Sequence, residues 1–306
     1  MSYAEPDIVV DFAAGDEVVP LTMTHSRTVT ADPLSSGFLW YTPPLAAVPE
    51  THQDDSGATW SIAGHDYQVL AMTLPPGEQL VTEIGTYVFG SPELQTKVDL
   101  TLCARESVWE GCQRILGGES CVKVLLVNGG ATEGFVGITP NFPAKIMPLQ
   151  FGKHITLDTS LIAQKGVYLS HVGDVTVGCD MDVSPVTCCC AGLGCFRQKI
   201  TGTGTTFLNA GGTIVYKQLL HDQETITVDT TSIIAMEETV QMGIVPNGRC
   251  CTMAFGGECC FSTTLTGPGK VFLQSMSFYK FQQAVQQTVV EEKDRGGPNT
   301  NNLNNL

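Results

Sequence analysis

Stretches of alternating apolar and polar residues, rich in β-branched side chains, recur through the middle of the chain. Two of them, KHITLDTSLIAQK (153–165) and ETITVDTTSIIAM (224–236), alternate with the two-residue period of a half-buried strand. Near the C-terminus the apolar residues instead recur at steps of three and four. They are Phe278, Phe281, Val285 and Val289. The pattern predicts an all-β body followed by one amphipathic helix over about 277–292.

The strand-like stretches belong to a longer internal repeat. GLGCF (192–196) matches GECCF (257–261), and TGTGTTFLN (201–209) matches TGPGKVFLQ (266–274). GGESCV (117–122) is a third version of the first motif. One cysteine slot is common to the three versions: Cys121, Cys195 and Cys260. Because the slots lie about 65 to 75 residues apart, we predict three tandem β units, over about 66–150, 151–220 and 221–276.

The two ends of the chain differ from this body. Residues 1–65 are rich in proline, and we expect an N-terminal extension that packs on the body through Trp40 and Trp60. The body with its helix spans about 66–285. Residues 293–306 form a polar, asparagine-rich tail, a composition typical of disorder.

Charge and composition narrow the class of protein. The 306 residues carry a formal net charge of −15, and lysines and arginines are scattered singly, a composition that disfavours a nucleic acid as partner. The acidic N-terminus lacks the features of a secretory signal or a mitochondrial presequence. No apolar run is long enough for a transmembrane segment. We therefore expect a cytoplasmic protein, in which the twelve cysteines are reduced thiols.

Three landmarks carry a resemblance to a known family. They are ILGGESCVKVLL (115–126), FLNAGGTIVYKQL (207–219) and FGGECCFSTTLTGPGKVFLQS (255–275). Together they resemble the altered-inheritance-of-mitochondria protein 24 family, also described as tryptophan RNA-binding attenuator protein-like (TRAP-like). The resemblance covers about 66–285.

The resemblance implies tandem β-sandwich units of the double-stranded β-helix type and assembly as a homotrimer. It implies no enzymatic activity. For eukaryotic members it implies a role in mitochondrial inner-membrane organisation, which makes a mitochondrial location the alternative to a cytoplasmic one.

The glycine-rich motif TGPGKVF resembles a phosphate-binding loop but departs from it at two points. No hydroxyl residue follows Lys270, and a strand rather than a helix comes next. We interpret the motif as a hairpin turn that joins two strands. The sequence also contains no G-x-S-x-G nucleophile motif.

Metal chemistry has weak support in the sequence. A metal centre of the type found in double-stranded β-helices needs clustered histidines, and those of the body are dispersed. They are His154, His171 and His221. A structural metal between Cys190, Cys195 and cysteines of the next unit stays open as an alternative. We assign no catalytic residue, no cofactor and no metal ligand.

Several acids stand at repeated positions beside the cysteine slot. Glu119 and Glu258 follow glycine pairs in the first and third units. Asp158 and Asp229 share another slot, with Glu83 at the corresponding place in the first unit. Short carboxylates at such places favour capping of a turn. Together with Cys121, Cys195 and Cys260, these acids are the positions worth testing.

The absence of a catalytic constellation, together with repeated packing motifs, favours a structural or scaffolding protein that self-associates. The first alternative is a ligand- or RNA-binding module, by analogy of fold. The second is a metal-dependent enzyme on a double-stranded β-helix scaffold.

Overall fold

The computed structural model describes residues 39–41, 51–99, 123–181, 196–246 and 261–295. In this part of the chain nearly all regular structure is antiparallel β-sheet, which confirms the predicted all-β class. The exceptions are the short 3-10 helix η1 (Thr230–Ser232) and the α-helix α5 (Phe278–Arg295). The three- and four-residue spacing therefore predicted the helix correctly, and only its C-terminal end lies further along the chain.

Most strands fall into three successive runs of six, which we call units 1, 2 and 3. Unit 1 contains β4 (Val69–Leu74), β5 (Gln79–Thr82), β6 (Tyr87–Gly90), β7 (Leu94–Asp99), β8 (Lys123–Asn128) and β9 (Gly134–Ile138). Unit 2 contains β10 (Lys145–Gln150), β11 (Leu161–Ala163), β12 (Tyr168–Val172), β13 (Val175–Met181), β14 (Phe196–Gly202) and β15 (Thr205–Ala210). Unit 3 contains β16 (Ile214–Leu219), β17 (Thr225–Val228), β18 (Ile233–Glu237), β19 (Gln241–Pro246), β20 (Phe261–Thr266) and β21 (Gly269–Gln274).

All three units have the same pairing pattern. The sixth strand lies between the first and the third, and the fifth lies between the second and the fourth. Unit 1 thus pairs β9 with β4 and β6, and β8 with β5 and β7. Strand β10, which the sequence boundary at residue 150 assigns to the first unit, pairs with β15 of unit 2.

The fifth and sixth strands of a unit do not pair with each other, although a short glycine-rich turn connects them. β20 lies in a three-stranded sheet and β21 in a seven-stranded one, so the predicted hairpin at TGPG is wrong. The turn is a corner where the chain crosses between sheets. Gly202 (φ +140°) and Gly269 (φ +143°) supply backbone conformations that other residues rarely adopt. A Cβ atom on Gly202 would also overlap the carbonyl oxygen of Asp174.

The two look-alike strand motifs fold differently. ITV of the second motif lies in β17, but the matching residues 155–157 of the first motif form no strand beyond an isolated bridge at Ile155, and only Leu161–Ala163 become strand β11. Backbone N–H groups of Lys153 and His154 turn back to the carbonyl of Gln150. Asp158 adopts a positive φ of 64°. Period-two alternation alone therefore overestimated this strand.

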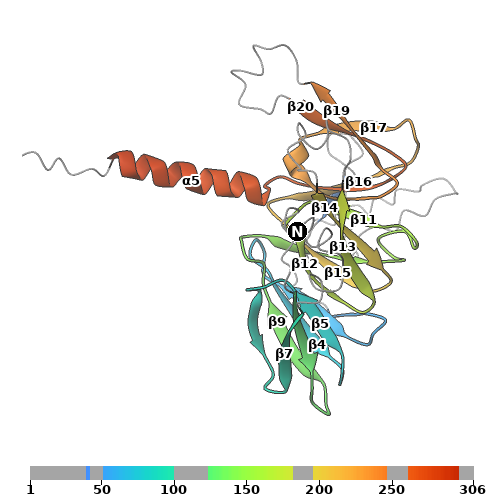
Figure 1. The fold of residues 1–306 in the computed structure, drawn as a ribbon, viewed down its shortest axis with the longest axis vertical. Helices are drawn as coiled ribbons and strands as arrows, with labels where there is room; N and C mark the ends of the chain where they lie inside the picture. Colours follow the sequence, from blue (N-terminus) through green and yellow to red (C-terminus); the bar gives the residue numbers. More distant parts are fainter. Residues whose placement is uncertain (1–38, 42–50, 100–122, 182–195, 247–260, 296–306) are drawn as a thin grey trace, which may run out of the picture.

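Consecutive units join by strand pairing. β12 of unit 2 pairs with β5 of unit 1, and β18 of unit 3 pairs with β11 of unit 2. We call these contacts joint 1/2 and joint 2/3. They produce the six-stranded and seven-stranded sheets, and the units follow one another along the long axis of the molecule (Figure 1). The buried core runs across the joints, since Leu70 of unit 1 belongs to the same cluster as Leu169 of unit 2.

The pairing pattern ends at two strands. β6 of unit 1 is an edge of the five-stranded sheet β2-β3-β4-β9-β6, and β17 of unit 3 is an edge of the three-stranded sheet β17-β20-β19. β6 occupies the place in unit 1 that β12 and β18 occupy in their units. β17 occupies the place of β5 and β11. Among the described residues, each lacks the partner strand that its counterparts have.

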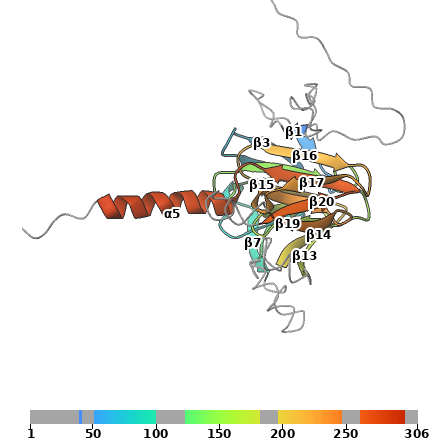
Figure 2. The ribbon, with the colours of Figure 1, turned by 90° about the horizontal axis from the view of Figure 1, so that it is seen from above.

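The described part of the N-terminal extension covers the outer strands of units 1 and 3. β3 (Thr59–Ala63) pairs with β4 and with β2 (His52–Gln53), while β1 (Leu39–Tyr41) pairs with β16. The ring of Trp60 packs edge-on against Phe207, with ring centroids 5.2 Å apart, so this tryptophan anchors the extension as predicted. The polar tail from residue 296 onward lies outside the described residues. Helix α5 extends away from the sheets (Figure 2).

Candidate functional site

A group of polar side chains, most of them buried, lies at joint 1/2. Lys123, at the start of β8, is only 4% exposed. Its ammonium forms an ion pair with Glu83, which follows β5, and lies 4.0 Å from the centre of the Tyr168 ring on β12. A buried ammonium needs such partners because its desolvation is costly. The ammonium of Lys123 thus has partners from both units, Glu83 from unit 1 and Tyr168 from unit 2.

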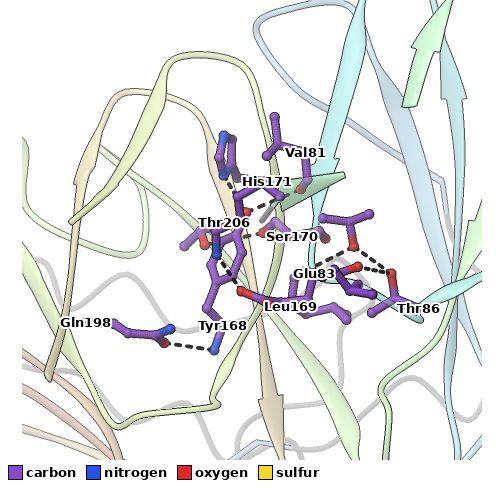
Figure 3. Close-up of polar contacts among 12 residues, drawn as sticks. Val81, Glu83, Thr86, Tyr168, Leu169, Ser170, His171, Gln198 and Thr206 are labelled. Carbon is purple, nitrogen blue, oxygen red and sulfur yellow. Dashed lines mark hydrogen bonds and ion pairs between the residues drawn. The ribbon is translucent and has the colours of Figure 1, made fainter. Parts of the chain in front are cut away.

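His171 completes this group, which we call the joint cluster; Figure 3 labels its members Glu83, Tyr168 and His171. Its Nδ1 lies 2.6 Å from the Tyr168 hydroxyl, and that hydroxyl donates to the carbonyl of Val81 at 3.3 Å. Burial, with a further contribution from nearby Lys123, lowers the pKa of His171 to about 3. The imidazole is therefore neutral at physiological pH. In that state it is a neutral hydrogen-bonding partner of the Tyr168 hydroxyl.

Backbone bonds fix the register of the same joint. The N–H of Glu83 donates to the carbonyl of Leu169 at 3.0 Å, and the hydroxyl of Thr82 donates to the same carbonyl at 3.1 Å (Figure 3). Joint 2/3 repeats the first of these bonds, from Gln164 N–H to the carbonyl of Ile234 at 2.9 Å. The two joints therefore share one backbone geometry.

Joint 2/3 has a different set of buried polar side chains. The carboxylate of Glu237 accepts hydrogen bonds from the backbone N–H of Thr156 at 3.1 Å and of Lys270 at 2.8 Å. The Lys270 ammonium donates to the carbonyl of His154 at 2.6 Å. Burial lowers the pKa of Lys270 and lowers that of His154 to about 4. The lysine of the TGPGK motif thus has a packing role in this joint.

The structure separates the two aspartates that the sequence placed in one slot. Asp229 follows β17 and caps η1, where its carboxylate accepts from the Thr231 N–H at 3.2 Å. Strand pairing makes Asp229 the counterpart of Glu83 and Gln164. Asp158 instead lies before β11, in the turn described above. The alignment failed because two similar motifs occupy different places in their units.

The remaining positions singled out from the sequence lie outside the described residues. They are Cys121, Cys195, Cys260, Glu119 and Glu258. Lys123 and Tyr168 were not singled out, although a signal existed for the lysine. The signal is its position in the repeat. A polar residue stands two positions after each repeated cysteine, at the start of the fifth strand: Lys123, Arg197 and Ser262.

The chemistry of the joint cluster suits holding two units together within one sheet. Its lysine, tyrosine and histidine are buried and contact one another. The described residues contain no group of His, Cys, Asp and Glu side chains that could hold a metal ion. In the same part of the chain, no helix is long and apolar enough to cross a membrane.

The fold and the joints define an all-β protein in which units of one pairing pattern are joined strand to strand. A family model described as mitochondrial biogenesis AIM24 matches residues 60–276. The chain belongs to this family, which implies a role related to mitochondrial biogenesis.

Among solved structures, a Streptococcus pyogenes protein, SPYM3_0169, has a similar fold. Its TM-score is 0.57 at 18% sequence identity, and the match covers 76% of this chain and 99% of that one. At this identity the likeness concerns the fold alone. No match to a curated protein was found.

Proposed function

We propose that the protein is a non-enzymatic scaffold that assembles with copies of itself, strand β6 of one molecule pairing with strand β17 of the next. The observation that carries this proposal is the fit between the two outer edges. β6 is the counterpart of the strands that two joints already use, and β17 is the counterpart of their partners. A contact between molecules would repeat the strand pairing seen at joints 1/2 and 2/3.

The internal joints specify the register of this contact. Ser170 pairs with Thr82, and Ala235 pairs with Ala163. The third strand of every unit contains one register shift. It lies just before Ser170 in β12, just before Ala235 in β18 and just before Phe89 in β6. Phe89 is therefore the counterpart of Ser170 and Ala235. Val228 is in turn the counterpart of Thr82 and Ala163.

The expected pairs between molecules are Phe89 with Val228, Gly90 with Thr227, and Ser91 with Ile226. The bond from Asp229 N–H to the carbonyl of Val88 would take the place of the bond from Glu83 to Leu169.

Exposed apolar side chains at β6 support the same contact. Tyr87 is 52% exposed and Phe89 42%, and Phe135 on the neighbouring strand β9 is exposed as well. The rings of Phe89 and Phe135 lie 6.3 Å apart. An edge strand that carries a cluster of exposed apolar groups is a template for pairing with another chain.

A contact between two different edges is head-to-tail, so it generates a closed ring or an open filament. We propose closure as a homotrimer in which each chain contributes three TRAP-like units of the double-stranded β-helix type. Within the family role, such a ring would support the organisation of a mitochondrial or membrane-associated complex. The location, cytoplasmic or mitochondrial, is a separate question that fractionation of cells answers.

A substitution in β17 tests the assembly. Residues of a strand present their N–H groups to alternate sides, and just after β5 the N–H of Glu83 faces the neighbouring unit. The N–H of Thr227, two residues before the counterpart Asp229, then faces outward. Thr227→Pro removes this outward donor and leaves the β17–β20 ladder its own bonds. Thr227→Val keeps the N–H and is the matched control.

Light scattering coupled to gel filtration gives the readout. We expect a trimer for the wild type and Thr227→Val, and a folded monomer for Thr227→Pro. A wild type that is monomeric at every concentration would refute the proposal. The two alternatives stay predictions, which a salt-sensitive gel shift with RNA and a metal analysis of the purified protein test.

A further inference from the structure

Helix α5 begins beside the edge strand β17. The ammonium of Lys280, in the first turn of α5, lies 2.5 Å from a carboxylate oxygen of Asp229, the residue that follows β17. The Lys280 N–H donates to the hydroxyl of Ser277 at 3.2 Å, and the Phe278 ring lies 5.0 Å from that of Phe142. The start of the helix is therefore fixed at the end of unit 3.

The pair Lys280–Asp229 has a counterpart inside the molecule. Asp229 corresponds to Glu83, whose carboxylate pairs with Lys123 of the fifth strand. In unit 3 the residue at the position of Lys123 is Ser262, which has no charge to offer. Helix α5 supplies the missing cation from a different element.

The third member of the joint cluster also has a counterpart. Tyr168, whose ring lies against the Lys123 ammonium, is the first paired residue of β12 before the register shift. The same position in β6 is Tyr87, and in β18 it is Ile233. The combination of acid, lysine and tyrosine is therefore found complete at joint 1/2. Its parts stand at the two outer edges, with acid and lysine at one and tyrosine at the other.

We propose that Lys280 of α5 binds the ring of Tyr87 of a second copy of this chain, so that the C-terminal helix completes the joint between molecules. The inference rests on the proposed assembly through β6 and β17. Lys280 is held by Asp229 as Lys123 is held by Glu83, and its side chain is still 40% exposed. An ammonium above a tyrosine face gains a cation–π interaction that strengthens as the contact loses water.

This contact would also distinguish the edge between molecules from joint 2/3. The corresponding residues there are Gln164, Arg197 and Ile233, which provide neither the acid nor the ring. A mispaired chain that offered β18 to β17 would place Ile233 against Lys280 and lose the cation–π interaction. The group of Asp229, Lys280 and Tyr87 therefore favours β6 over β18 as the partner of β17.

The test measures the subunit dissociation constant of the full chain by sedimentation over a dilution series with a thiol reductant. Lys280→Gln should weaken assembly by about tenfold, the effect of a partly desolvated cation–π contact. Lys280→Arg and Tyr87→Phe keep the cation and the ring and should assemble as the wild type does. Lys199→Gln, which removes a similar exposed pair with Glu238, is the matched control and should change nothing.

A double-mutant cycle decides whether the two side chains meet. If they do, Lys280→Gln combined with Tyr87→Leu weakens assembly by clearly less than the sum of the two single effects. Additive effects would overturn the contact. Normal assembly of Lys280→Gln would also overturn the contact. If Thr227→Pro is monomeric in the same experiment, the proposed pairing of β6 with β17 still stands. A monomeric wild type would instead refute the assembly and this inference together.

Discussion

Two lysines with similar partners have very different surroundings. Lys123 is buried at joint 1/2 between Glu83 and the Tyr168 ring, whereas Lys199 pairs with Glu238 on the surface. A salt bridge in water contributes little, because solvent screens it and two long side chains must be ordered. Removal of one partner from a buried pair leaves the other charge without compensation. Burial therefore decides which lysine matters.

Lys123→Met tests this difference, since methionine keeps the length of the side chain and loses the charge. We expect a loss of about 3 kcal/mol in the free energy of unfolding, because Glu83 loses its partner inside the joint. Lys199→Met should cost less than about 1 kcal/mol. Urea denaturation followed by circular dichroism measures both values. Equal losses would contradict the role of burial.

What the sequence could predict differs between residues. The capping role of Asp229 was predictable, because an aspartate before a run of hydroxyl residues commonly accepts such bonds, here from the N–H and the hydroxyl of Thr231. The contact of Lys123 with Tyr168 was not, since it depends on how unit 2 packs on unit 1. Contacts between distant strands follow from the register of a joint, and no local pattern encodes that register.

At the scale of elements, the glycine corners determine how each unit is divided between sheets. Gly202 ends β14 and, with the residues after it, directs the chain into β15 of a different sheet. The sequence indicated a turn at this place but predicted a hairpin. A hairpin and a corner both need glycine, so composition could not separate them.

Gly202→Ala should destabilise the protein by at least about 2 kcal/mol, because its φ suits glycine and the new methyl group would meet the backbone of Asp174. Gly178→Ala in β13 is the control. Its nearest neighbour, the carbonyl of Lys199, would lie 3.9 Å from the added Cβ, so we expect a change within about 0.5 kcal/mol. Thermal unfolding of both variants gives the comparison. A Gly202→Ala protein as stable as the control would show that the corner tolerates a side chain.

At the scale of the whole molecule, the protein is a row of units whose contacts are polar as well as apolar. The alternation along the chain predicted sheets, but it did not indicate that two of them, the six-stranded and the seven-stranded sheet, are each shared between two units. Both buried histidines with lowered pKa values lie at the shared sheets, His171 at joint 1/2 and His154 at joint 2/3. The stability of the row should therefore depend on pH.

The direction of this dependence follows from the two pKa values. In the unfolded chain a histidine titrates near 6.5, whereas burial holds His171 at about 3 and His154 at about 4 in the folded protein. Below pH 6.5 the unfolded chain binds more protons, so the free energy of unfolding falls as pH decreases. Each histidine contributes a slope of about 1.4 kcal/mol per pH unit in the lower part of this window.

His171→Asn isolates one contribution, because asparagine keeps a hydrogen-bonding group for Tyr168 but does not titrate. The variant should be less stable at pH 7.5, yet lose stability more slowly than the wild type between pH 6 and 4.5, with about half of the histidine-dependent slope removed. Urea unfolding at several pH values measures these slopes. If the slope of His171→Asn equals that of the wild type, His171 does not couple the joint to pH, and the acid sensitivity must come from His154 and the carboxylates.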